Sequence, residues 1–124
     1  MIRTQIGHVA TAILREIDAM TRIGPVDRQK PMLVIEELRA FDWASVTFVG
    51  QRHEMDLRLD GDADVVAAAM VRLSDDLAAA EIPMAGHFIA EIRVIPGDRM
   101  APEPDQQRET VRQPIRIEAL VLRD

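Results

Sequence analysis

The residues of this chain best suited to acid–base chemistry near neutral pH are its three histidines. His53 and His87 could each serve as a general acid or base, because an unperturbed imidazole changes charge close to physiological pH. His53 ends a segment that is expected to form a turn, so exposure to water is the simpler interpretation for it. His8 is expected to lie exposed in the first turn of a helix.

His87 and Glu91 fall in a segment that alternates apolar and polar residues as a strand does. The rise of a strand puts them on one face but roughly 13 Å apart, which is too far for a catalytic dyad. A ligand could instead contact charged residues spread over several strands of that face. The candidate ligand-binding residues are His53, His87, Glu91, Arg93 and Glu118.

Signatures of catalysis and of metal binding are missing from the sequence. A site made of His53, His87 and Glu118 would use ordinary metal ligands, but nothing in their spacing supports it. The chain has no cysteine, no phosphate-binding glycine loop and no nucleophile motif. The acidic run 60–64 is too short for a calcium loop, and helix capping explains it better. We therefore predict no catalytic residue, no metal and no cofactor.

The same predicted sheet face carries aliphatic side chains that a monomer seldom leaves exposed together. These side chains could pack against a second copy through a two-fold axis, or beneath the first helix. Trp43 is expected to be a core or rim anchor beside the hairpin, or alternatively an interface hot spot. The candidate interface residues are Ile89, Ile95, Leu120, Leu122 and Trp43. The alternative is a solvated face with cross-strand ion pairs, each contributing about 1 kcal/mol or less.

Two segments with helical periodicity must help to position these residues. Apolar residues recur at spacings of three and four in residues 4–21 and again in 62–81. Asp62 is expected to cap the second helix, and Pro83 to end it because proline has no amide hydrogen. Whether the first helix packs on its own chain or on a neighbouring chain remains open.

Strand periodicity fills most of the remaining chain. Alternation at every second position predicts strands at residues 44–50, 54–60, 87–95 and 115–122. A turn at 50–53 would join the first two into a hairpin. Segment 32–38 fits either a strand or a helical stripe, and we favour a strand followed by a turn at 39–42. In segment 87–95 the expected core residues are Phe88, Ala90, Ile92 and Val94.

The expected order of elements is α-(β)-β-β-α-β-β, which predicts an α+β fold with an antiparallel sheet of four or five strands and two helices packed on it. A chain of 124 residues is expected to form a single domain, residues 1–124. Residues 97–113 are acidic, contain prolines and have few apolar residues, so a mobile loop is predicted there.

The net charge of −6 argues against nucleic acid and against an anionic membrane surface as partners. No apolar run approaches the roughly 20 residues that span a bilayer, and the first residues lack the apolar run of a signal peptide. A cytoplasmic location is therefore expected. The sequence favours a non-enzymatic module that binds a protein partner or forms a homodimer or other homo-oligomer. The alternative is a small-molecule-binding protein or enzyme that uses His53 and His87.

Overall fold

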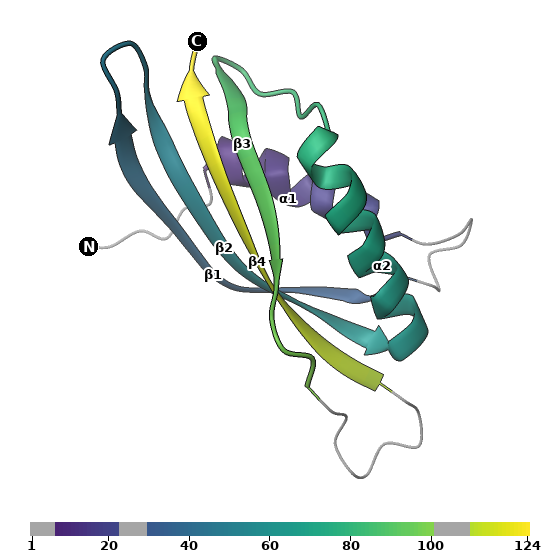
Figure 1. The fold of residues 1–124 in the computed structure, drawn as a ribbon. Helices are drawn as coiled ribbons and strands as arrows, with labels where there is room; N and C mark the ends of the chain where they lie inside the picture. The colour runs from purple at the N-terminus through teal and green to yellow at the C-terminus, as the bar shows by residue number, and fades with distance from the viewer. Residues whose placement is uncertain (1–6, 23–29, 101–109) are drawn as a thin grey trace.

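The computed structural model describes residues 7–22, 30–100 and 110–124. Within these ranges the elements follow in the order α-β-β-α-β-β (Figure 1). The helices are α1 (His8–Met20) and α2 (Ala63–Asp76), followed by the 3-10 turn η2 (Leu77–Ala79). The strands are β1 (Met32–Ala44), β2 (Val49–Asp62), β3 (His87–Pro96) and β4 (Thr110–Arg123). The predicted α+β fold with two helices on an antiparallel sheet is confirmed.

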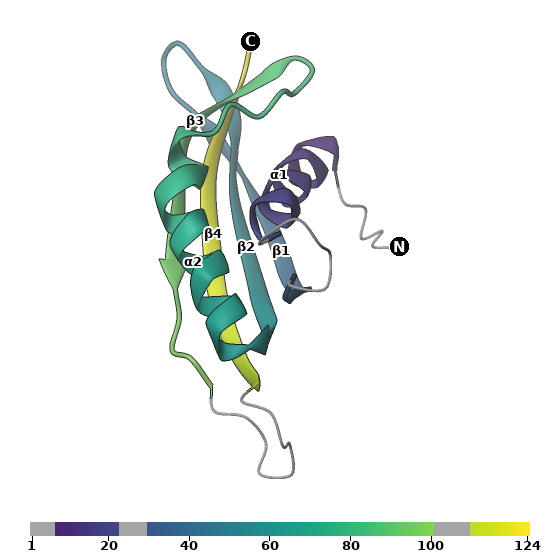
Figure 2. The same cartoon turned by 90° about the vertical axis from the view of Figure 1, so that its right-hand side faces the viewer.

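The strands form one antiparallel sheet in the order β1-β2-β4-β3. Although β4 comes last along the chain, it lies in the interior of the sheet between β2 and β3. Both helices cover the same face of the sheet, and the β1–β2 turn extends beyond them (Figure 2). We call the uncovered face the outer face.

The turn between β1 and β2 lies at residues 45–48, earlier in the chain than the turn predicted at 50–53. The favoured strand at 32–38 is confirmed, but β1 continues to Ala44, so the turn predicted at 39–42 is wrong. Most of the predicted strand 44–50 is the turn itself, in which the Phe48 amide donates to the Ser45 Oγ at 3.1 Å. The serine hydroxyl stabilises the turn locally. Residues 39–42 are extended because Arg39 pairs with carboxylates of the adjacent strand.

Helix α1 packs on the sheet of its own chain, which settles the question left open by the sequence. Ile13 and Ile17 are fully buried in the same core as Met55 and Leu57 of β2. This burial follows the predicted apolar stripe. The first residues of the predicted helix 4–21 lie outside the described residues, and the described helix begins at His8.

Helix α2 begins where it was predicted but ends earlier. Its α-helical part stops at Asp76, and η2 continues it to Ala79. Asp62 occupies the N-cap position, yet its side chain makes no capping hydrogen bond, so that part of the prediction is wrong. Apolar side chains on the sheet-facing side of α2, such as Leu73, join the common core.

Strand β3 contains a bulge between Ile89 and Glu91 that reverses the predicted faces at its beginning. Ile89 lies opposite Val121 and packs against the core, whereas it was expected on the other face. Phe88, expected in the core, lies opposite Leu122 on the outer face. Beyond the bulge the predicted alternation holds.

The segment predicted as a loop, 97–113, overlaps the start of β4, which begins at Thr110. Residues 101–109 lie outside the described residues. Among the described residues, no helix is long and apolar enough to cross a membrane.

Candidate functional site

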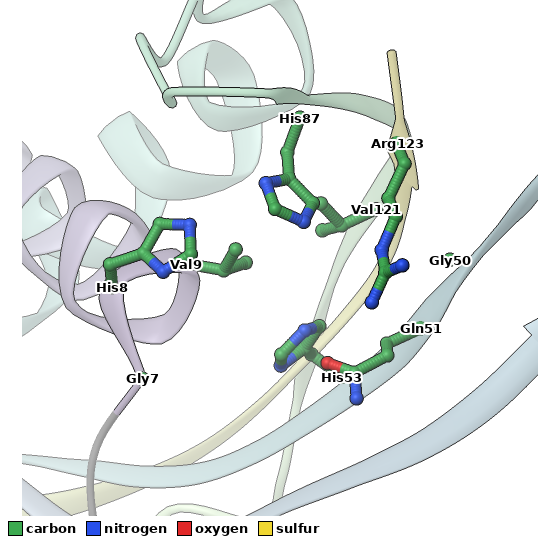
Figure 3. Close-up of a pocket in the computed structure, with 9 residues that line it drawn as sticks. All are labelled: Gly7, His8, Val9, Gly50, Gln51, His53, His87, Val121 and Arg123. Carbon is green, nitrogen blue, oxygen red and sulfur yellow. The ribbon is translucent and has the colours of Figure 1, made fainter.

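All three histidines of the chain line one cavity of about 240 Å³, which we call the histidine cavity (Figure 3). It lies between the first turn of α1 and one end of the sheet, where β2, β3 and β4 meet. Its lining residues are Gly7, His8, Val9, Gly50, Gln51, His53, His87, Val121 and Arg123. Residues far apart in sequence thus converge on one small space.

The imidazole rings of His8 and His87 contact each other edge to face. Their centroids are 5.1 Å apart and the ring planes make an angle of 61°. The His87 Nδ1 lies 2.9 Å from the carbonyl oxygen of Ala85 and donates a hydrogen bond to it. This bond fixes the orientation of the ring, which leaves its Nε2 available on the other side.

His53 is buried, which contradicts the expectation of an exposed turn residue. It lies within β2 and is 7% exposed, and its Nε2 has no hydrogen-bond partner among the described residues. Burial lowers the pKa of His53, and the neighbouring His87 lowers it further by charge repulsion. A buried imidazole with one unpaired nitrogen therefore lies in the wall of the cavity.

We expect stability to fall as the pH drops below the ordinary histidine range. The unfolded chain protonates His53 near pH ~6.5, whereas the folded protein resists that proton until a lower pH. The unfolded state therefore binds more protons in this window, and the free energy of unfolding decreases until the pH passes the folded pKa. Urea denaturation at a series of pH values measures this slope.

The matched comparison uses two substitutions of histidine by glutamine. His53→Gln should flatten the pH dependence, because it removes the buried imidazole that responds to pH. His8→Gln, at the exposed start of α1, is the control and should keep most of the slope. Equal slopes for wild type and His53→Gln would contradict this assignment.

The structure divides the five candidate ligand-binding residues between the two faces of the sheet. His53 and His87 line the histidine cavity on the helix side. Glu91, Arg93 and Glu118 lie on the outer face, where Arg93 and Glu118 form an ion pair at 3.3 Å. No single ligand of small size could contact all five.

Sequence reasoning missed His8, Gln51 and Arg123 as cavity residues. A signal for Gln51 was present, because its position continues the alternation that buries Met55 further along β2. Arg123 likewise continues the core-facing series of β4. No sequence signal linked His8 to either strand.

The central part of the outer face holds a network of paired charges. Arg39 contacts Glu37 at 2.8 Å, Asp56 at 2.9 Å and Glu54 at 3.3 Å, and Arg116 contacts Asp56 at 2.9 Å. Burial opposes the charge of Asp56, but hydrogen bonds from Arg116 and Arg39 outweigh it and lower the pKa of that carboxyl. Asp56 therefore stays ionised and paired near neutral pH, which makes it a poor general base.

One end of the outer face carries an aromatic patch, formed by Phe41, Trp43, Phe48 and Phe88. These are the four aromatic residues of the chain, so the core is built without phenylalanine, tyrosine or tryptophan. The Phe48 and Phe88 rings lie 6.2 Å apart at 78° to each other. Because they come from the β1–β2 turn and from β3, their contact spans the intervening β4 and helps to bury Leu122.

The five candidate interface residues are placed differently from one another. Trp43, Leu120 and Leu122 lie on the outer face at or beside the aromatic patch, although Leu122 is 6% exposed. Ile95 lies on the outer face at the other end of β3, opposite Arg116. Ile89 is on the helix side, because the bulge in β3 turns it toward the core.

Comparisons with known proteins identify a shared fold. No protein-family model matches the chain, and no curated protein matches it. A chain in the solved structure "Virion of native gene transfer agent (GTA) particle" has a similar fold, with a TM-score of 0.61 and 15% sequence identity. The match covers 90% of this chain and 92% of that chain. At this identity the likeness concerns the fold.

The three histidines do not amount to a metal centre in the described part of the chain. No group of three or more histidine, aspartate or glutamate residues there is placed to hold a metal ion. Arg123, a permanent cation, also lines the cavity and would repel a metal ion. The geometry suits hydrogen bonding to an anion better than it suits coordination of a cation.

Proposed function

We propose that this chain is a non-enzymatic structural subunit that assembles with further copies of itself. The observation that carries the proposal is the aromatic patch on the outer face. Aromatic side chains are enriched at the centres of protein interfaces, where they contribute much of the binding energy. This chain holds all of its aromatic residues at the surface of one sheet face and none in its core.

The fold likeness supports the same proposal. The protein with the similar fold is part of a virion particle, and nearly the whole of both chains takes part in the match. A domain of this architecture can therefore be built into a large protein assembly. We propose a cytoplasmic location as well, as the sequence indicates.

The charge network next to the patch fits an interface rim. Rims of interfaces are polar and solvated, whereas their centres are apolar. Paired carboxylates and guanidinium groups beside the aromatic side chains give such a border, and they would fix the orientation of a partner. The outer face thus has both parts of an interface.

Phe41→Glu tests the assembly proposal. Phe41 is 48% exposed on β1, so a charge there spares the core of the monomer but opposes burial in an interface. We expect self-association to weaken at least tenfold, in the range of a typical hot-spot residue of about 2 kcal/mol or more. Native mass spectrometry and sedimentation velocity over a range of protein concentrations measure the change.

The control is Val71→Glu on α2, which is 61% exposed on the opposite side of the molecule. It adds the same charge away from the patch and should leave self-association unchanged. Leu122→Glu is unsuitable, because that side chain is buried and its loss would disturb the monomer. A wild-type protein that stays monomeric at high concentration, or equal association of the two glutamate variants, would contradict the proposal.

A further inference from the structure

The histidine cavity is a second site that the proposed assembly does not use. It lies on the helix side of the sheet, whereas the aromatic patch lies on the outer face. Its lining includes three imidazoles and one guanidinium but no carboxylate side chain. For a chain with a net charge of −6, this is an unusual local concentration of basic groups.

The burial of the His53 side chain indicates that a hydrogen-bond partner is missing. The residue is 7% exposed, and its Nε2 has no partner among the described residues. Figure 3 shows the rings of His8, His53 and His87 surrounding the same space. A buried polar atom without a hydrogen-bond partner destabilises the folded protein, and a ligand that accepts a hydrogen bond from the His53 ring would offset part of this cost.

The first turn of α1 contributes a second feature of an anion site. Gly7 is the N-cap residue, and no side chain caps this helix. The first backbone amide groups of a helix have no intrahelical acceptor, and the helix dipole places positive potential there. Gly7, His8 and Val9 line the cavity, so this positive end adjoins the histidines.

Arg123 adds a full positive charge. Within the described part of the chain it has no ion-pair partner, in contrast to Arg39 and Arg116 on the outer face. A guanidinium group presents two parallel N–H donors that match the oxygens of a carboxylate or phosphate. The Gln51 side chain supplies a neutral amide donor beside it.

We propose that the histidine cavity binds a small free oxyanion of the phosphate or carboxylate class, held by Arg123, His53 and the first turn of α1. The cavity, with a volume of about 240 Å³, has room for a ligand of this size. Inorganic phosphate and short carboxylates are the simplest ligands of this class. The site is independent of the aromatic patch.

Titration of the imidazole resonances by NMR tests this proposal. Inorganic phosphate, added at constant ionic strength against sodium chloride, should shift the His53 signals along a saturable curve. Arg123→Gln should weaken phosphate binding about tenfold or more, because a charge-assisted hydrogen bond is lost. Acetate should compete with phosphate for the same site. This result would show that the cavity binds oxyanions as a class and not phosphate alone.

Arg52→Gln is the matched control. Arg52 precedes His53 on β2 but faces the outer side of the sheet opposite Leu120, so the variant has the same change in net charge without touching the cavity. It should bind phosphate as the wild type does. Circular dichroism shows whether each variant is folded.

Two results would overturn the oxyanion site. One is the absence of any saturable His53 shift, with chloride and phosphate giving the same spectra. The other is an equal loss of binding in Arg52→Gln and Arg123→Gln, which would show attraction to overall charge rather than to the cavity. His53→Gln should also weaken phosphate binding in a protein that remains folded. Phosphate binding equal to that of the wild type in this variant would count against the proposal.

Discussion

Replacement of Leu73 by alanine is expected to lower the free energy of unfolding by about 2–5 kcal/mol. Leu73 is completely buried in α2, where it packs in the common core with Leu77 and with side chains of β2 and β4. The substitution removes apolar contact and leaves a cavity that a densely packed interior fills poorly. Urea denaturation followed by circular dichroism measures the loss.

Val71→Ala on the same helix is the control for this prediction. Val71 is exposed, so its truncation should change stability by about 0.5 kcal/mol or less. Both substitutions shorten an aliphatic side chain of the same helix to alanine, so the two variants differ mainly in the burial of the replaced side chain. A Leu73→Ala variant as stable as Val71→Ala would show that α2 does not pack on the sheet as described.

Gly50→Ala is expected to cost about 3 kcal/mol or more, even though it adds a single methyl group. A Cβ atom at this position would lie 2.1 Å from the carbonyl oxygen of Val121 and 2.9 Å from the Cα of Leu122. Both are backbone atoms of β4, the strand paired with β2. No side-chain rotation can relieve such a contact, so the two strands must separate locally.

Gly7→Ala separates this steric effect from the general cost of replacing glycine. A Cβ at Gly7 would meet no atom within 4 Å, and the change at an N-cap position should cost about 1 kcal/mol or less. Thermal and urea denaturation of the two variants give the comparison. Equal effects would indicate that β2 and β4 are further apart at Gly50 than the structure places them.

The sequence predicted the fold well where one periodicity acts over a long segment. The alternation of Met55, Leu57 and Leu59 and the helical stripe of α1 both identified buried faces correctly. These patterns are local, because each side chain's direction follows from the backbone period. The class and order of the elements follow from them.

Errors arose where a single residue interrupts the period. The bulge after Ile89 reverses the faces of early β3, and alternation cannot show where an extra residue is inserted. The β1–β2 turn was misplaced because residues 39–42 look polar, although Arg39 belongs to a cross-strand charge network. Such pairing depends on register, which the sequence of one strand does not contain.

The candidate site was least predictable, because it depends on tertiary structure. His8, His53 and His87 come from three different elements and meet only after α1 packs on the sheet. The gathering of the aromatic residues on one face depends likewise on strand order and on the β3 bulge. Phe88 was expected in the core, and Phe41 was expected in a turn, so their place beside Trp43 could not be predicted.

The interior position of β4 also has a consequence for how the chain folds. When synthesis has reached the end of β3, β2 has a partner on one edge alone and β3 has none. The β1–β2 hairpin can form early, since its strands are adjacent in sequence, whereas the pairing of β2 with β4 joins distant parts of the chain and raises the contact order. On the ribosome, the apolar faces of α1 and α2 therefore lack a complete sheet until residues 110–123 emerge, and this is the interval in which a chaperone would be of most use.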